Sequence, residues 1–247
     1  MNTAKKVILK NEGDIGILQI NNPPENYLED PEFMGLEEIK RFVDTGIKAL
    51  VIEGVGRHFS AGANLEVFEN QVKDKKAFLD QLSKGNKLLN YIDTLNIPVL
   101  ASISGVCFGA GLEIALTCDI RIAEENSFFA FPEVNHNMFP GLSGTARLAE
   151  LTSKIIALEL VLYGDMINAE KAIELGIIDE VVSRKKAIGN SVNRAIKMTN
   201  NRPLSVINAV MSSVHNSKLL NTDDRIKADI EMFVKLAFEN MNQKTEN

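Results

Sequence analysis

Two short stretches with glycines could place backbone N–H groups around a bound oxygen atom. Residues 59–64 read Phe-Ser-Ala-Gly-Ala-Asn, and residues 105–113 read Gly-Val-Cys-Phe-Gly-Ala-Gly-Leu-Glu. Each follows an apolar run typical of a buried strand, at 49–53 and 98–103. Small residues at a strand end let a ligand approach the backbone and leave N–H groups free to donate to it. Two such donors on one oxygen would form an oxyanion hole, which stabilises developing negative charge.

Two glutamates, Glu113 and Glu133, could move protons beside that oxygen. Glu113 lies one short turn into a helix expected from residue 110, and Glu133 follows Pro132 on a loop expected after a strand. Two carboxyl groups that face one water can accept a proton at one atom and deliver one at another, if burial tunes their pKa values. Taken alone, each glutamate could be structural, since a carboxylate is favourable near a helix N-terminus and common on a surface loop.

The elements that must position these groups alternate between strands and helices. In chain order the sequence predicts a hairpin (7–9 with 15–20), a helix (32–44), a strand (49–53), a helix (76–94), a strand (99–103), a helix (110–117) and strand-like segments (120–123 and 128–130). Beyond Gly141 the pattern is mostly helical, with a last short strand at 178–182. This order indicates an α/β architecture with crossovers, followed by a helical C-terminal part.

Composition excludes several function classes. The chain has 247 residues, 45% of them hydrophobic, so it can bury a sizeable core as one domain, or as one domain with a helical appendage. Its net charge of −6 argues against general nucleic-acid binding, and no apolar run is long enough to predict a membrane span. The N-terminus is too quickly charged for a secretory signal, and two cysteines do not suggest a disulfide scaffold, so we expect a cytoplasmic protein. No His/Cys/Asp cluster has metal-ligand spacing, so we expect no metal.

Taken in order, these motifs resemble those of the crotonase (enoyl-CoA hydratase/isomerase) superfamily. Besides the two glycine stretches, the resemblance includes residues 113–123, 131–134, 139–145 and 176–182, and it covers roughly positions 5–240. It implies an α/β fold in which a crotonase-like spiral of β-β-α units is followed by a helical C-terminal region. Residues 1–190 would form the spiral core with the active site. Residues 191–247 would form the C-terminal region, shorter than in many relatives.

The resemblance also implies the roles of particular residues. The backbone N–H groups of Ala63 and Ala110 would form the oxyanion hole, and Glu113 and Glu133 would be catalytic. We expect Glu133 to handle the proton at Cα and Glu113 to orient and activate the water. The substrate-binding residues implied by motif position are Ser60, Ala61, Gly62, Asn64, Leu65, Gly109, Gly111, Pro140 and Gly141.

The function implied is that of an enoyl-thioester hydratase or dehydratase, a hydro-lyase of fatty acid or polyketide metabolism. It would use no cofactor beyond the CoA or phosphopantetheine arm of its substrate, and would assemble as a homotrimer or a dimer of trimers. Alternatives are an enoyl-CoA isomerase or decarboxylase of the same superfamily, or a catalytically idle binding homologue. The acyl group stays open.

Some positions depart from the family pattern. Glu25 and Glu66 stand where a basic residue is frequent, which would weaken the hold on CoA phosphates unless neighbouring subunits or other lysines supply the charge. A substrate carried by an acyl carrier protein is therefore a hypothesis beside CoA. His136 stands at a usually aliphatic position, and is either structural or a polar group directed towards an unusual acyl chain. Asn137 replaces a frequent glycine, and asparagine is among the residues that accept a left-handed conformation.

Overall fold

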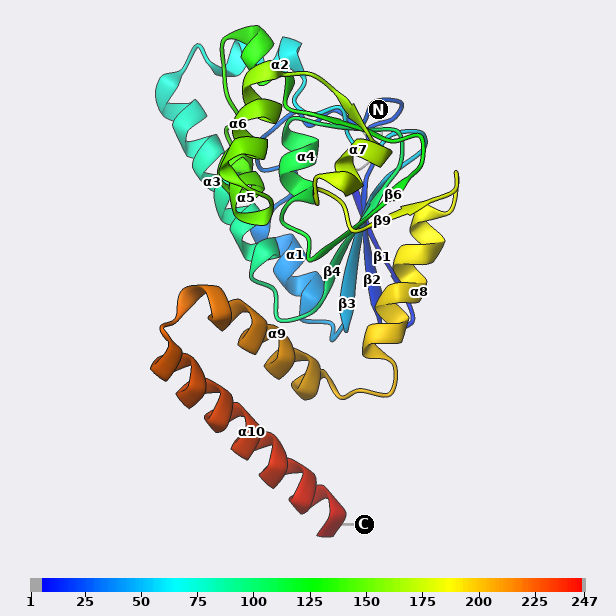
Figure 1. Ribbon diagram of the computed structural model, residues 1–247, viewed down its shortest axis with the longest axis vertical. Coiled ribbons are helices and arrows are strands. Elements are labelled where there is room, and N and C mark those ends of the chain that lie inside the picture. Colours follow the sequence, from blue (N-terminus) through cyan, green and yellow to red (C-terminus); the bar gives the residue numbers. More distant parts are fainter. Residues whose placement is uncertain (1–5, 246–247) are drawn as a thin grey trace.

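A mostly parallel sheet lies at the centre of the fold (Figure 1). Over residues 6–245, which the computed structural model describes, this main sheet has six strands in the order β1-β2-β3-β4-β6-β9. β1 and β2 form the expected antiparallel hairpin, and the other pairings of this sheet are parallel. Its strands are β1 (Val7–Glu12), β2 (Ile15–Ile20), β3 (Ala49–Gly54), β4 (Val99–Ile103), β6 (Ile120–Glu124) and β9 (Glu180–Val182).

Helices cover both faces of the main sheet, which explains why its strands read as continuous apolar runs. In β3, Leu50 and Ile52 face the larger core, while Ala49 and Val51 pack on the opposite side against α8 (Ala187–Thr199). The larger core also contains buried residues of α1 (Leu36–Val43), α3 (Lys75–Asp93) and α4 (Ala110–Ala115).

A second, small sheet contacts α4 through its strand β5. Its strand order is β5-β7-β8, with β5 (Val106–Phe108) parallel to β7 (Phe128–Ala130) and β7 antiparallel to β8 (Ile167–Asn168). Strands of two or three residues carry too little pattern to detect, and only β7 was expected from the sequence. The remaining helical segments are α2 (Leu65–Gln71), the single-turn 3-10 helix η1 (Pro132–His136), α5 (Gly144–Leu151), α6 (Lys154–Tyr163), α7 (Ala169–Glu174), α9 (Leu204–Leu219) and α10 (Thr222–Thr245).

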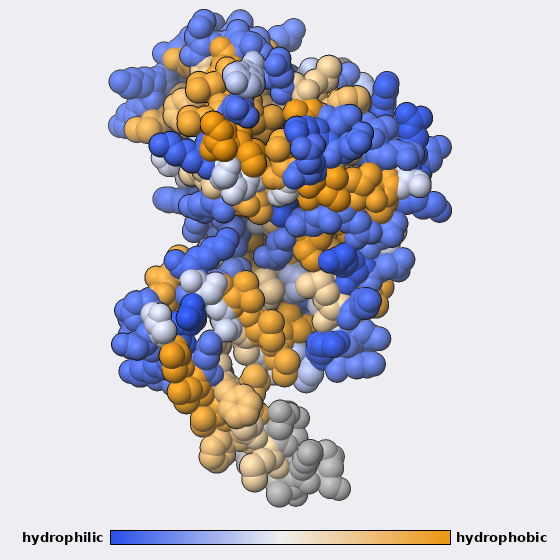
Figure 2. Space-filling view, in the orientation of Figure 1, coloured by the Kyte–Doolittle hydropathy of each residue, from blue (hydrophilic) through white to orange (hydrophobic). Residues whose placement is uncertain are grey.

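The last two helices extend away from the rest of the molecule. Figure 1 shows α10 at the far end of an arm that α9 connects to the sheet-containing body. Ile207 and Met211 of α9 are buried in the larger core, whereas no described residue of α10 is buried. Apolar side chains form a band along the visible side of this arm, beside hydrophilic residues at its bend (Figure 2). Those exposed on α9 and α10 include Val210, Val214, Leu219, Ile226, Ile230, Phe233, Val234 and Phe238.

The α/β spiral class expected from the sequence is confirmed, with differences at element ends. The helix expected over 32–44 begins at Leu36, and the last strand expected over 178–182 begins at Glu180. Directly before this strand, Asp179 accepts a hydrogen bond from the Arg121 side chain. The expected division at residue 190 stays a prediction; α8 crosses it, and residues 1–5 and 246–247 lie outside the described part. Within residues 6–245, no helix is long and apolar enough to span a membrane.

Candidate active site

The two glycine stretches meet at a cavity of about 850 Å³. Its wall comes from residues 27–31, the first glycine stretch, α2, α3, the start of α4, η1 and residues 137–142. Most of the site residues expected from the sequence line it: Ala61, Gly62, Ala63, Asn64, Leu65, Gly109, Ala110, Glu113, Glu133 and Gly141. Ser60, Gly111 and Pro140 do not line it.

The N–H groups of Ala63 and Ala110 have no hydrogen-bond acceptor among the described residues. Leu28 pairs with the first glycine stretch in parallel: its N–H donates to Gly62 O (2.8 Å), and its carbonyl accepts from Asn64 N (2.9 Å). This pairing uses the groups on either side of Ala63 and leaves the Ala63 N–H without a partner in the described part of the chain. Ala110 is the first residue of α4, where a helix leaves its N–H groups unpaired. A Cβ added at Gly62 would lie 3.5 Å from Ala110 N, so the two loops are in backbone contact.

Ser60 and Gly111 hold the two loops together from behind the cavity wall. The Ser60 hydroxyl donates to Asn26 O (2.8 Å) and accepts from Gly62 N (3.1 Å), so it fixes the turn that precedes Ala63. A Cβ at Gly111 would come within 2.7 Å of Ser60 O, which leaves no room for a side chain between α4 and the first stretch. Pro140 is buried directly before Gly141. These three residues are therefore placed to shape the cavity and not to contact its contents.

Glu113 is fixed on one side of the cavity by two backbone donors. Its Oε1 accepts from Leu142 N (2.7 Å) and Gly144 N (2.8 Å), and its side chain is buried. Burial raises the pKa of Glu113 to about 7, helped by the charge of Glu133 and opposed by the two N–H donors. We call residues 142–144, which carry these two N–H groups, the donor segment. A Cβ at Gly144 would lie 2.6 Å from Glu113 Cγ, so only glycine lets the donor segment approach Glu113 this closely.

Glu133 reaches the same cavity from η1. The sequence suggested a loop here, but Pro132 begins a single 3-10 turn that ends at the left-handed Asn137 (φ 58°), as its residue type allowed. Burial raises the pKa of Glu133 to about 7, and its Oε2 is buried without a hydrogen-bond partner. A Cβ added at Gly109 would lie 2.9 Å from Glu133 Oε1, so this carboxyl group stands directly beside the residue that precedes Ala110.

The donor segment that holds Glu113 is itself tied to α3. Asn86 Nδ2 donates to Gly141 O (3.1 Å), and the Ser143 hydroxyl donates to Asn86 Oδ1 (2.9 Å). Arg147 donates from Nη1 to Leu142 O (2.7 Å) and pairs through Nε with Asp93 at the end of α3 (3.1 Å). Sequence reasoning missed these residues, because their partners lie more than fifty positions away.

The rest of the cavity wall is apolar with an acidic side. Phe68 and Phe78 meet edge to face with ring centroids 5.5 Å apart, and Leu82 and Phe139 also line the wall. His136 lines the cavity as well. Glu29, Asp30 and Glu66 add three carboxyl groups, and no Lys or Arg of the described chain lines the wall. Glu29 and Asp30 were missed because the Leu28–Ala63 pairing that brings them here leaves no periodic signal.

Comparison with known proteins identifies the family. The family model for Enoyl-CoA hydratase/isomerase matches residues 10–246. The chain belongs to the enoyl-CoA hydratase/isomerase family. It is 31% identical over 209 residues to the short-chain-enoyl-CoA hydratase of Clostridium acetobutylicum, covering 81% of this chain and 77% of that one. It is 30% identical over 235 residues to the 2,3-dehydroadipyl-CoA hydratase of Escherichia coli, covering 94% and 90%.

Solved structures agree with this family fold. The structure of DspI from Pseudomonas aeruginosa superposes with a TM-score of 0.86 at 27% identity, over 96% of this chain and 97% of that one.

Within residues 6–245, no group of three or more His, Cys, Asp and Glu side chains is arranged to hold a metal ion.

Proposed function

We propose that this enzyme is a hydro-lyase that adds water to, or removes it from, the α,β double bond of an enoyl thioester. The observation that carries the proposal is the convergence of two unpaired backbone N–H groups with the buried carboxyl group of Glu113 and the half-buried one of Glu133 on one cavity. Relatives named as enoyl-CoA hydratases support the same reaction. No cofactor is proposed beyond the arm that carries the acyl group.

In the hydration direction, the thioester oxygen would accept hydrogen bonds from Ala63 N and Ala110 N. Glu113, as a carboxylate, would take a proton from water as the water oxygen bonds to Cβ. The electron pair of the double bond would move towards the thioester carbonyl, and the negative charge on its oxygen would be stabilised by the two donors. Glu133, protonated at the start, would then deliver its proton to Cα, and dehydration would reverse these steps.

The surroundings of the two carboxyl groups favour this division of roles. Two N–H groups donate to Glu113 Oε1, and such donors favour the charged form that a base needs. Glu133 Oε2 receives no hydrogen bond, so its protonated form costs less there. Both pKa values are raised to about 7, so one protonated and one ionised carboxyl group can coexist near neutral pH. Among the other wall residues, we propose that Ala61, Gly62, Asn64, Leu65, Gly109 and Gly141 contact the substrate.

The reaction is tested with a trans-2-enoyl thioester in water labelled with ¹⁸O. Hydration predicts loss of the ultraviolet absorbance of the conjugated thioester together with one labelled oxygen at C3. An isomerase would move the double bond without taking up label, and a decarboxylase would act on a carboxylated thioester. An idle binding homologue would leave the substrate unchanged.

The charged residues of the active-site cavity wall indicate which carrier, CoA or an acyl carrier protein, holds the acyl group. CoA brings several phosphate charges, and Asp30 and Glu66 would repel them, whereas the charge of Glu29 is paired with Lys6. This favours a phosphopantetheine arm on an acyl carrier protein as a second candidate substrate. We would compare one acyl group on both carriers, with Glu66→Lys expected to improve kcat/KM for the CoA thioester at low salt. A strong preference of the unchanged enzyme for CoA would reject the carrier-protein substrate.

The arm formed by α9 and α10 supports a proposal for assembly. Its exposed residues include Val214, Ile230, Phe233 and Phe238, more apolar surface than a helix keeps in water without a partner. We propose that other copies of this chain cover it in a homotrimer or a dimer of trimers, located in the cytoplasm. Light scattering behind size exclusion would test the assembly: a monomeric mass at micromolar concentration would contradict it.

A further inference from the structure

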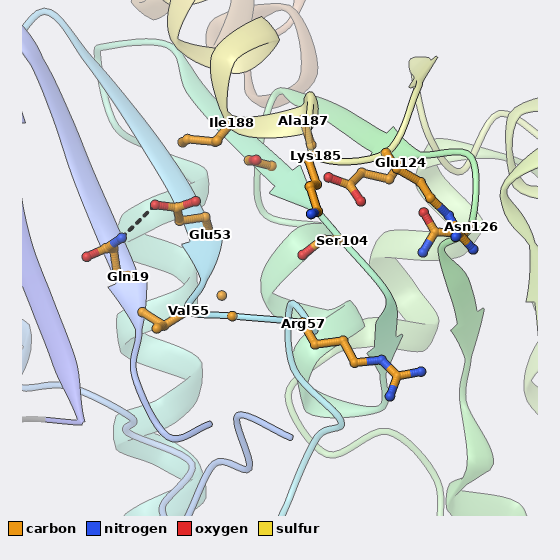
Figure 3. A pocket seen from close by; sticks show the side chains of 14 residues that line it. Gln19, Glu53, Val55, Arg57, Ser104, Glu124, Asn126, Lys185, Ala187 and Ile188 are labelled. Atoms are coloured by element: carbon orange, nitrogen blue, oxygen red, sulfur yellow. Dashed lines mark hydrogen bonds between the residues drawn. The ribbon is translucent and has the colours of Figure 1, made fainter. Parts of the chain in front are cut away.

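A second cavity, of about 650 Å³, opens where parallel strands of the main sheet end (Figure 3). Gln19, Glu53, Ser102 and Glu124 line it from the last residues of β2, β3, β4 and β6, and the start of α8 closes one side. The carboxyl ends of parallel strands are a common place for ligands in α/β folds. This second cavity shares no lining residue with the active-site cavity.

The second cavity contains acceptors that no donor of the described residues satisfies. Glu124 is only 8% exposed, and among the described residues none donates to its carboxylate or forms an ion pair with it. Asn126 Oδ1 is also buried without a partner. Glu53 receives one hydrogen bond, from Gln19 Nε2 (2.7 Å). A buried acceptor such as Asn126 Oδ1 is normally satisfied. Together with the unpaired carboxylate of Glu124, it fits a ligand that donates several hydrogen bonds from a cationic nitrogen.

The second cavity also has cationic groups in its lining. Arg57, Arg184 and Lys185 line it, and in the described structure none of the three forms an ion pair. Lys185 extends from the segment before α8 towards the strand ends (Figure 3). The N-terminus of α8 adds backbone N–H groups without a side-chain cap. Cations and a helix N-terminus together favour a carboxylate or phosphate.

We propose that the second cavity binds a small aliphatic zwitterion. Its ammonium group would donate to Glu124, Asn126 and Glu53, and its carboxylate would lie near Arg184, Lys185 and the start of α8. The apolar side chains of the lining, Val55, Ala187 and Ile188, are aliphatic, and no aromatic ring lines this cavity, which argues against a nucleobase or an aromatic ligand.

Calorimetry with the purified full-length enzyme tests this proposal. The probes are linear amino acids from glycine to 6-aminohexanoate, with pentylamine and valerate as analogues that keep one charged end each. One chain length should bind best, and each single-charge analogue should bind at least about tenfold more weakly, because a charge-assisted contact is lost.

Matched variants show where the probe binds. Glu124→Gln should weaken binding of the best amino acid about tenfold, while Glu125→Gln, a change at the exposed neighbour that does not line the cavity, should not. Arg184→Ala should weaken it, while Lys186→Ala should not. The proposal is overturned if no amino acid binds at about 20 mM, if pentylamine or valerate binds as tightly, or if Glu124→Gln and Glu125→Gln behave alike. Absence of binding because a neighbouring chain fills the cavity would overturn it equally.

Discussion

The two cavities of this enzyme place their charges in opposite ways. Five carboxyl side chains and no Lys or Arg line the active-site cavity, beside several aromatic rings. The second cavity has two carboxyl groups, three cations and no aromatic ring. In the first, an apolar surrounding raises the pKa values of Glu113 and Glu133 into the range where protons can be exchanged near neutral pH. In the second, mixed charge suits the recognition of a polar ligand. Under the two proposals, similar side chains would serve proton transfer or binding according to what surrounds them.

Among variants that should affect one cavity and not the other, Glu133→Gln should have the largest effect. The amide cannot deliver a proton to Cα, so hydration of an enoyl thioester should fall by roughly 10²–10⁴-fold in kcat. Glu69→Gln, an exposed change on α2 that does not line the active-site cavity, is the control and should retain activity. Amino-acid binding by the second cavity should be the same in both variants. Normal turnover by Glu133→Gln would remove Glu133 from the reaction.

Ala110→Pro tests the oxyanion hole without adding a charge. Proline is tolerated at the first position of a helix but has no N–H, so one donor is lost while α4 can still form. We expect kcat to fall about 10²–10³-fold, the typical cost of removing one such donor. Ala110→Ser keeps the N–H and should retain most activity. Equal steady-state kcat values for Ala110→Pro and Ala110→Ser would exclude the N–H of residue 110 as an oxyanion-hole donor.

Gly144→Ala tests whether the position of Glu113 limits the reaction. The new Cβ would lie 2.6 Å from Glu113 Cγ and 2.9 Å from Phe131 Cζ, so the donor segment or the glutamate must move. We expect about a tenfold loss of kcat and a loss of about 1–3 kcal/mol in unfolding free energy. Gly189→Ala in α8, where a Cβ meets nothing within 4 Å, should leave kcat unchanged and not destabilise. Chemical denaturation and steady-state kinetics would show both effects.

The pH dependence of kcat/KM should be a narrow bell centred near pH 7. Activity rises as Glu113 loses its proton to become the base, and falls as Glu133 loses the proton that it must deliver. Burial raises both pKa values to about 7, so the two limbs lie close together. Because the carboxyl groups interact, the profile reports the pair and not either residue alone. A flat profile from about pH 5 to 9 would contradict the assignment of these two groups.

Glu113→Gln should change stability in a pH-dependent way. The pKa of Glu113 is about 7 in the folded enzyme, against an ordinary value of 4.5, so the folded state holds the proton more tightly. Its contribution to stability is complete below about pH 4.5 and is lost as pH rises through about 7. The variant should therefore gain stability relative to the unchanged enzyme at pH 8, by about 1–3 kcal/mol, and less at pH 5. Thermal melts at both pH values would test this difference.

The sequence predicted the groups that a local motif carries and missed those that distant pairing brings in. Glu113 and the two alanines belong to the glycine-bearing stretches, Glu133 follows the Phe131-Pro132 pair, and all four line one cavity. Ser60 and Gly111 belong to the same motifs, yet they lie behind the wall, because spacing alone does not say which side of a turn faces the cavity.

The same distinction applies to the elements of the fold. Long periodic segments such as α3 were predicted within one residue at each end, while β5 and β8 were too short to give a pattern. The second cavity left no sequence signal, since its residues come from four strand ends and the start of one helix. Its lining depends on the order of the strands in the sheet, which residue patterns within each strand do not reveal.

The ties between α3 and the segment at residues 141–144 have a consequence for altering chain-length preference. Leu82 of α3 lines the cavity, and one turn later Asn86 of the same helix holds Gly141 and Ser143. A bulkier or smaller residue at Leu82 would therefore disturb Glu113, the proposed base, along with the cavity wall. Substitutions at Phe68 or Phe139, outside α3, offer a route to new thioesters that leaves this glutamate in place.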